Sequence, residues 1–290
     1  MAQDLVAAYP QARAVFEQAD GTLGLSLSSL CFTGPEDQLT DTINAQPALL
    51  THSIAALRVL QTRQPALTPA FVAGHSLGEY SALVAADALE FADALKLVRE
   101  RGRVMKAAGE KTPGAMAAVI GIDTAALEGV CAETGAQIAN YNAPGQIVIS
   151  GEKDALSRAV ELAKTRGAKR AIVLAVSIAS HSRLMENAAR EFANAVAGTP
   201  MRAPKIPVIS NVSAQPLTAV EQIRHELVTQ LTSSVQWIKT IDYITAQGVT
   251  KFIEMGPKDV LAGLIRRINK DVHAVSIGDV ASVKGVGEAA

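Results

Sequence analysis

The 290-residue sequence contains few cysteines and almost no net charge. Its two cysteines, Cys31 and Cys131, are far apart and show no paired spacing, which argues against a disulfide framework and against a zinc site. The formal net charge is −1 and no basic run is concentrated anywhere, so binding to nucleic acid is not expected. These features predict a protein of the reducing cytoplasm, and they give no sign of a metal ion or a cofactor.

The sequence also lacks a long apolar run. No stretch approaches the roughly 18 consecutive apolar residues that a membrane-spanning helix needs, and the first residues do not form a charged and then apolar export signal. Repeats and low-complexity segments are absent as well. What the chain does have is 49% hydrophobic residues, enough to fill a sizeable core. We therefore expect a globular protein without a membrane partner.

Predicted helices and strands alternate along the chain, which is typical of an α/β fold with a mostly parallel sheet. The large part of the chain, residues 1–113 and 178–290, is expected to form an α/β-hydrolase-like parallel-sheet core. Residues 114–177 have a different order of predicted elements, βαββαβ. The elements expected there are strand 115–120, helix 124–134, strand 137–141, strand 146–150, helix 154–166 and strand 169–176. This order is typical of a ferredoxin-like unit, so we predict an inserted small subdomain. The tail beyond Asp279 is small and polar and is expected to be disordered.

The most informative stretch is 73–79, which reads AGHSLGE and follows a short apolar segment, residues 70–73. A serine between two glycines, after a strand and before a helix, is typical of a nucleophile elbow, in which the serine hydroxyl is exposed at a tight turn. Ser76 is therefore the candidate nucleophile, and the N–H of Leu77 is the candidate oxyanion donor. The alternative is an ordinary strand-to-helix turn whose serine only caps the helix at 77–86.

A serine nucleophile needs a base, and the chain offers five histidines. His181 follows a predicted strand and precedes a predicted helix, at the end of the sheet where α/β proteins place their chemistry. His52 and His225 lie inside predicted helices, and His75 is expected to support the site from beside the nucleophile. An α/β-hydrolase would instead use the late His273. The spacing alone leaves His181 open to a second interpretation, a hydrogen-bonded loop histidine.

A set of short motifs in one order runs almost from end to end of the chain. These motifs are GHSLGE at 74–79, RG at 101–102, GAM at 114–116, NYN at 140–142, ASH at 179–181, SNV at 210–212, VQW at 235–237 and GP at 256–257. No single motif is decisive, but the ordered set resembles the malonyl-CoA:acyl-carrier-protein transacylases of fatty acid and polyketide synthesis.

The resemblance implies a reaction in two halves. Ser76 would take malonyl from malonyl-CoA and then hand it to the phosphopantetheine thiol of an acyl carrier protein. His181 would act as general base and acid, and Gln236 would orient His181 in place of a carboxylate. Asn140 and Asn142 would border the cleft.

Arg101 is predicted to point inward, because on a helix over 94–105 it shares a stripe with Leu97, Val98 and Met105. A buried guanidinium needs an anion or several acceptors. From the residues alone, an ion pair with a core carboxylate is one candidate. With the resemblance, the better candidate is the malonyl carboxylate, which the planar guanidinium of Arg101 could bind with two hydrogen bonds. Acetyl lacks this carboxylate, so the contact would also favour malonyl over acetyl.

The start of the chain departs from this resemblance, which implies an N-terminal strand and a loop rich in glycine and glutamine before the first helix. Residues 1–5 already look like that helix. We therefore expect one more parallel strand beside the elbow strand to be missing from these residues, with reduced activity. Two competing functions remain. One is a serine esterase or thioesterase of α/β-hydrolase type. The other is a non-enzymatic scaffold that binds a carrier protein.

Overall fold

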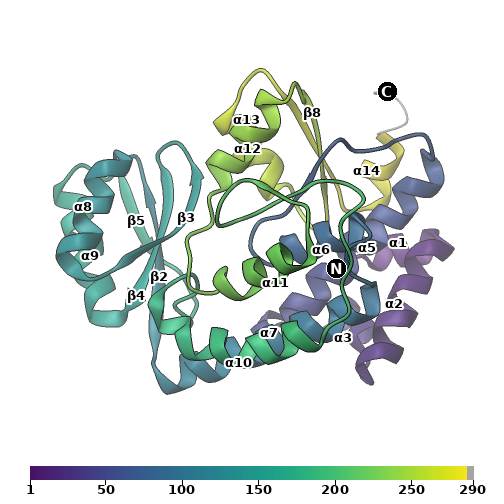
Figure 1. The fold of residues 1–290 in the computed structure, drawn as a ribbon, viewed down its shortest axis with the longest axis horizontal. Coiled ribbons are helices and arrows are strands. Elements are labelled where there is room, and N and C mark those ends of the chain that lie inside the picture. The colour runs from purple at the N-terminus through teal and green to yellow at the C-terminus, as the bar shows by residue number, and fades with distance from the viewer. Residues whose placement is uncertain (286–290) are drawn as a thin grey trace.

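The small sheet, seen in teal at the left of Figure 1, has four antiparallel strands in the order β3-β4-β2-β5. Its elements in the computed structural model are β2 Gly114–Ile120, α8 Thr124–Thr134, β3 Gln137–Ala143, β4 Gln146–Glu152, α9 Lys153–Thr165 and β5 Arg170–Val173. Local signals set these bounds. The Asp123 side chain caps α8 by accepting from the N–H of Ala126, and Gly135, at φ 84°, ends it.

The sheet packs its two helices against one face only. Ala117 and Val119 of β2 belong to the apolar cluster that includes Leu127 of α8 and Leu156 of α9. Met116, which directly precedes Ala117 in the sequence, belongs to a different and much smaller cluster. The alternation of β2 side chains therefore gives the small sheet one helix-covered face and a second face turned to the rest of the molecule.

The remaining elements form the helical body, drawn mainly at the centre and right of Figure 1. Its helices are α1 Gln3–Ala8, α2 Pro10–Leu23, α3 Leu27–Thr33, α4 Glu36–Thr40, α5 Thr42–Arg63, α6 Gly78–Ala85, α7 Phe91–Lys111, α10 Glu186–Gly198, α11 Val220–Thr229, α12 Trp237–Ala246, α13 Val260–Ile268 and α14 Val280–Gly285. Its strands are β1 Val72–Ala73, β6 Val208–Ile209, β7 Pro216–Leu217, β8 Lys251–Met255 and β9 His273–Ile277. The structure describes residues 1–285, and within them no helix is long and apolar enough to span a bilayer.

The strands of the body do not form the one mostly parallel sheet that the sequence predicts. β1 pairs in parallel with β6, and β6 pairs antiparallel with β7. β8 and β9 form a second, separate parallel pair. The fold class is α/β as predicted, but its large sheet is divided into two short ones.

The prediction for the C-terminal tail also needs correction. The tail was expected to be disordered beyond Asp279, but residues 280–285 form α14, whose Val283 is buried against the main core. A side-chain contact anchors this helix, since the N–H of Val280 donates to the Asp4 carboxylate at 2.8 Å. The rest of that predicted tail, residues 286–290, lies outside the described residues.

The two glycines of the elbow turn out to have different roles. A Cβ at Gly74 would lie 2.0 Å from the backbone of Gly78, so only glycine fits there. A Cβ at Gly78 would meet nothing within 4 Å. Crowding by the backbone therefore requires glycine at position 74 but not at position 78.

Candidate active site

Ser76 lies at a sharp turn between β1 and α6, with a left-handed backbone at φ 52°. Its own N–H is taken, because it donates to Oδ1 of Asn211 at 2.6 Å. The N–H of Leu77, at the start of α6, donates to no protein acceptor within residues 1–285. This arrangement leaves one backbone donor free next to the serine hydroxyl, as an oxyanion site requires.

The structure brings Ser76 and His181 together. The distance from Ser76 Oγ to His181 Nε2 is 2.9 Å, although the two residues are 105 positions apart. His181 Nδ1 lies 2.9 Å from the carbonyl oxygen of Gln230 and 3.2 Å from that of Ser233. Carbonyl oxygens only accept, so they hold the imidazole proton on Nδ1 and leave the lone pair of Nε2 facing the serine.

His181 is buried, with 4% of its surface exposed, and it too has a left-handed backbone, at φ 58°. Burial, and after it the positive charge of Arg101, lowers the pKa of His181 to about 3. The imidazole is therefore neutral at physiological pH and can accept a proton from Ser76.

The prediction that Gln236 orients His181 is wrong. Within residues 1–285 the Gln236 side chain makes no hydrogen bond, and its backbone N–H donates to the carbonyl of Asn211 at 2.8 Å. The groups that hold the imidazole are the main-chain carbonyls of Gln230 and Ser233. A main-chain acceptor carries no side-chain signature, so the sequence motifs did not single out these positions.

Arg101 points inward from α7, as its helical stripe predicts, and is 2% exposed. Nη2 donates to Ser76 Oγ at 3.1 Å and to Oε1 of Gln230 at 2.9 Å, and Nη1 donates to Oε1 of Gln46 at 2.8 Å. Within residues 1–285 no carboxylate forms an ion pair with it, and its Nε has no hydrogen-bond partner. The predicted alternative of a structural ion pair is therefore wrong, and the groups that contact this buried charge, two amides, the Ser76 hydroxyl and the Tyr80 ring at 5.7 Å, carry no formal negative charge.

The buried carboxyl group of Glu79 connects Asn211 with Gln230. Oε1 of Glu79 accepts from the N–H of Asn211 at 2.9 Å and from its Nδ2 at 3.1 Å, while Oε2 accepts from Nε2 of Gln230. Asn211 Nδ2 also donates to the carbonyl of Gly74 at 2.7 Å. Burial, and then the nearby Glu226, raises the pKa of Glu79 well above its ordinary value. Because Gln230 contacts both His181 and Arg101, Glu79 fixes the residue on which the base and the guanidinium depend.

The small sheet meets the elbow through Asn142. His75 Nε2 lies 2.8 Å from Asn142 Oδ1, and the His75 ring lies 5.6 Å from that of Trp237. Burial lowers the pKa of His75, so its ring is neutral. Asn140, also on β3, is buried, and its Oδ1 lacks a hydrogen-bond partner in the described part of the chain. Both predicted asparagines thus lie on the strand that faces the elbow, but only Asn142 contacts a neighbour of Ser76.

The other histidines are not part of this arrangement. His273, which an α/β-hydrolase would use, is exposed on β9, while His181 bonds Ser76. His52 is buried on α5 and bonds the carbonyl of Gly278 at 2.7 Å. Across residues 1–285 no group of three or more His, Cys, Asp or Glu side chains is placed to hold a metal ion.

Comparison with known proteins agrees with this geometry. Residues 1–287 match the family model described as an acyl transferase domain. The chain is 46% identical over 289 residues to the malonyl CoA-acyl carrier protein transacylase of Bacillus subtilis (strain 168), which covers 98% of this chain and 90% of the relative. It is 44% identical over 283 residues to the protein of the same name from Escherichia coli (strain K12), covering 96% and 91%.

Solved structures agree as well. A malonyl-transacylase in complex with its type II PKS acyl-carrier protein matches with a TM-score of 0.97 at 41% identity, covering 100% of this chain and 95% of that one. An acyl carrier protein S-malonyltransferase from Vibrio cholerae matches with a TM-score of 0.95 at 44% identity, covering 99% and 94%. The chain belongs to the acyl transferase family and, within it, to the group of the malonyl CoA-acyl carrier protein transacylases.

Proposed function

We propose that this protein transfers malonyl from malonyl-CoA to the phosphopantetheine thiol of an acyl carrier protein, through a malonyl ester on Ser76. The observation that carries this proposal is the position of Ser76 Oγ, which lies 2.9 Å from a neutral imidazole and 3.1 Å from an arginine that has no carboxylate partner among the described residues. The contact with the His181 imidazole suits a nucleophile, and the nearby Arg101 guanidinium suits a substrate that carries a carboxylate.

In the first half-reaction, the Ser76 proton moves to Nε2 of His181 while Oγ attacks the thioester carbonyl. The N–H of Leu77 stabilises the oxyanion of the tetrahedral intermediate. The carbon–sulfur bond then breaks, and the proton on Nε2 passes to the departing coenzyme A thiolate. The second half-reaction reverses these steps, with the carrier thiol giving its proton to His181 and ending as the malonyl thioester.

His181 is suited to both directions because its Nδ1 proton is held by two neutral carbonyls, of Gln230 and Ser233. No carboxylate there stabilises the imidazolium, and the adjacent Arg101 disfavours it. An imidazolium formed in this site therefore readily returns its proton, which a transferase needs twice in each cycle.

Arg101 is proposed to bind the free carboxylate of malonyl. Leaving a buried guanidinium without an anion is unfavourable, and the malonyl carboxylate would supply one only when the correct substrate is bound. Acetyl has no such group, so the same contact provides selectivity. Asn140, Asn142 and His75 are proposed to border the cleft on the side of the small sheet.

The finer fold assignments are also proposals. The strand order β3-β4-β2-β5, with α8 and α9 on one face, supports a ferredoxin-like small subdomain over 114–177. The turn at Ser76 between β1 and α6 supports an α/β-hydrolase-like core over 1–113 and 178–290. The two unpaired cysteines support a cytoplasmic location.

Intact-mass measurement after incubation with malonyl-CoA tests the function. We expect one malonyl increment, mapped to the peptide that contains Ser76 and removed by adding a carrier protein with its phosphopantetheine arm. Ser76→Ala should abolish the increment, and Ser81→Ala, a matched change one helical turn further along, should keep it. Hydrolysis of malonyl-CoA with no transfer to the carrier would instead support a thioesterase, and an increment that survives in Ser76→Ala would disprove the proposed nucleophile.

A further inference from the structure

Tyr80 lies beside Arg101, and the proposed transfer steps give it no role. It is in the first turn of α6, the helix that follows Ser76, and its side chain is fully buried. Arg101 Cζ lies over the face of the Tyr80 ring, 5.7 Å from the ring centroid. The ring therefore lies next to the guanidinium that is proposed to bind the malonyl carboxylate.

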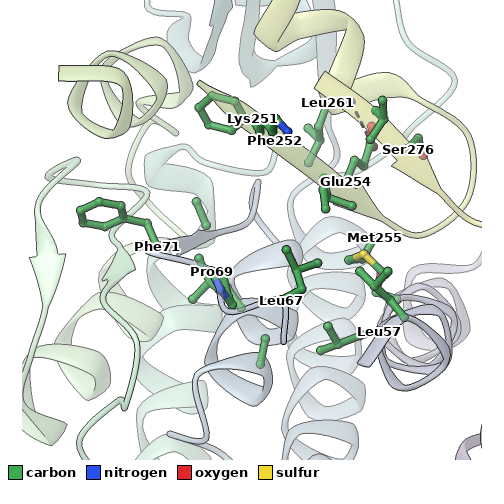
Figure 2. Close-up of a pocket in the computed structure, with 18 of the residues that line it drawn as sticks. Leu57, Leu67, Pro69, Phe71, Lys251, Phe252, Glu254, Met255, Leu261 and Ser276 are labelled. Atoms are coloured by element: carbon green, nitrogen blue, oxygen red, sulfur yellow. Dashed lines mark hydrogen bonds between the residues drawn. The ribbon is translucent and has the colours of Figure 1, made fainter. Parts of the chain in front are cut away.

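Tyr80 is on the side of α6 that is turned toward Arg101. Ser81, Ala82 and Ala85 are on the other side of the helix, where they line a separate cavity of about 750 Å³. Figure 2 shows this cavity, with Leu57 of α5 and Met255 of β8 in its wall. Tyr80 and Arg101 do not line it. The ring thus belongs to the active site and not to the cavity behind α6.

The guanidinium beside this ring is a buried cation whose hydrogen bonds go to the uncharged side chains of Gln46, Gln230 and Ser76. Burial lowers the pKa of Arg101, since the charged form loses its hydration. The face of an aromatic ring carries negative partial charge, and it attracts a desolvated cation more strongly than an exposed one. The Tyr80 ring therefore supplies, before substrate binds, part of the negative potential that a carboxylate would supply afterwards.

The hydroxyl of Tyr80 is not the group that interacts with Arg101. Among residues 1–285 this hydroxyl has no hydrogen-bond partner, and neither has Nε of Arg101. Burial raises the pKa of Tyr80, so the phenol stays neutral and provides no anion for the guanidinium. The interaction therefore depends on the face of the ring, which phenylalanine would keep and leucine would remove.

We propose that Tyr80 is a positioning residue for malonyl selectivity, whose ring face holds the Arg101 guanidinium in place beside Ser76 until the malonyl carboxylate binds. This inference rests on the proposed function, because it takes Arg101 as the group that binds that carboxylate. Binding of the carboxylate stabilises the bound substrate and the transition state alike, so loss of the ring should raise the KM for malonyl-CoA more than it lowers kcat. Acetyl transfer, which does not use the guanidinium, should change little.

Competition between malonyl-CoA and acetyl-CoA as donors tests the role of the ring. In Tyr80→Leu, we expect the malonyl-to-acetyl ratio of kcat/KM to fall by about thirtyfold, the factor that corresponds to a desolvated cation–π interaction. Tyr80→Phe should keep the ratio of the unsubstituted protein. Phe16→Leu is the matched control, because Phe16 is buried in the same apolar cluster and its ring packs against Phe32. It should lower stability and leave the ratio unchanged.

Fluorinated phenylalanines at position 80 test the ring face without a change in packing. Each added fluorine withdraws electron density from the face and leaves the shape of the ring almost the same. We expect the malonyl-to-acetyl ratio to fall in steps from Tyr80→Phe to its pentafluoro form. This series does not depend on whether Tyr80→Leu folds.

Three results would overturn the positioning role. One is an equal malonyl-to-acetyl ratio across the fluorinated series. Another is a Tyr80→Leu protein that loses stability but keeps the ratio, as a purely structural residue would. The third is a loss of the ratio in Tyr80→Phe itself, which would assign the effect to the hydroxyl. Failure of the proposed function is a distinct result, because the unsubstituted protein would then transfer no malonyl, and the role of Tyr80 would be refuted with it.

Discussion

The small sheet and the sheets of the helical body differ in how their strands are held. β2, β3 and β4 each have seven residues, and β2 is paired along both edges. β1, which leads into the nucleophile turn, has two residues and, within residues 1–285, one strand partner. Side-chain hydrogen bonds hold the backbone that follows β1, because the Asn211 side chain bonds both the Gly74 carbonyl and the Ser76 N–H. Regular pairing and an apolar core thus build one region, and a buried polar network positions the other.

This difference predicts that substitutions in the polar network reduce the activity of the protein molecules that do fold. The largest expected effect is at Arg101. Arg101→Ala should reduce malonyl transfer by about 10²–10³-fold, because truncating a buried charge partner costs about 2–5 kcal/mol. Transfer of acetyl, which has no carboxylate, should fall far less.

Steady-state kinetics with malonyl-CoA and acetyl-CoA as competing donors measure this ratio. Arg103→Ala is the matched control, since Arg103 lies on the exposed side of α7 and pairs with Glu100. An unchanged malonyl-to-acetyl ratio in Arg101→Ala would show that the malonyl carboxylate has another partner.

The opposite pattern is expected in the small sheet. Leu127 of α8 is fully buried in the apolar cluster under that sheet, so Leu127→Ala should lower stability by about 2–5 kcal/mol. Its kcat per folded molecule should stay close to that of the unsubstituted protein. Urea denaturation together with active-site titration by malonylation separates the two effects, and a loss of kcat larger than the loss of folded protein would contradict the comparison.

Glu79 should act as a positioning residue, with a smaller effect on rate. In Glu79→Gln, the new amide can accept on one side only, so it cannot satisfy both Asn211 and Gln230. We expect kcat to fall about tenfold, with the KM for malonyl-CoA unchanged, because one lost buried hydrogen bond costs about 1–3 kcal/mol and acts here through Gln230. Steady-state transfer from malonyl-CoA to a carrier protein measures both constants.

Glu254→Gln provides the control for that substitution. Glu254 is a partly buried acid whose carboxylate accepts from two main-chain N–H groups at the start of α13, and it lies outside the site. If both variants lose stability and neither loses kcat, Glu79 is only structural.

The smallest expected effect is a shift in pH dependence. The pKa of His181 lies at about 3, below its ordinary value of 6.5, through burial and then the charge of Arg101. The unfolded chain therefore binds this proton below pH 6.5 and the folded chain does not, so the contribution of His181 to stability is complete above pH 6.5 and is lost as the pH falls toward 3. In Arg101→Ala, one cause of the lowered pKa is removed, and the pKa of His181 should rise toward its ordinary value.

NMR titration of the His181 ring checks this shift directly, and acetyl transfer provides a rate to follow, since it does not need the arginine. An unchanged His181 titration in Arg101→Ala would mean that burial alone lowers the pKa.

The sequence predicted the small sheet well because its signals are local. Helix 124–134 was predicted with its observed bounds, since Asp123 and Gly135 mark its two ends. A turn motif, a loop position and a helical stripe also selected Ser76, His181 and Arg101, whose side chains the structure brings into contact. The role of Gln230 was missed because its main-chain carbonyl holds His181, and any residue has a carbonyl. The division of the large sheet was missed because strand pairing is set by contacts between distant segments.

The left-handed backbones of Ser76 and His181 also bear on how this protein can change. Each conformation costs of order 1–3 kcal/mol for a residue other than glycine, and glycine would remove that cost at either position together with the reactive side chain. Selection for stability alone would therefore favour glycine at both positions, and selection for activity opposes it. The polar network around Asn211 and Gln230 holds both turns in place. At each of these two positions, the residue that is needed for activity therefore lowers the stability of the fold.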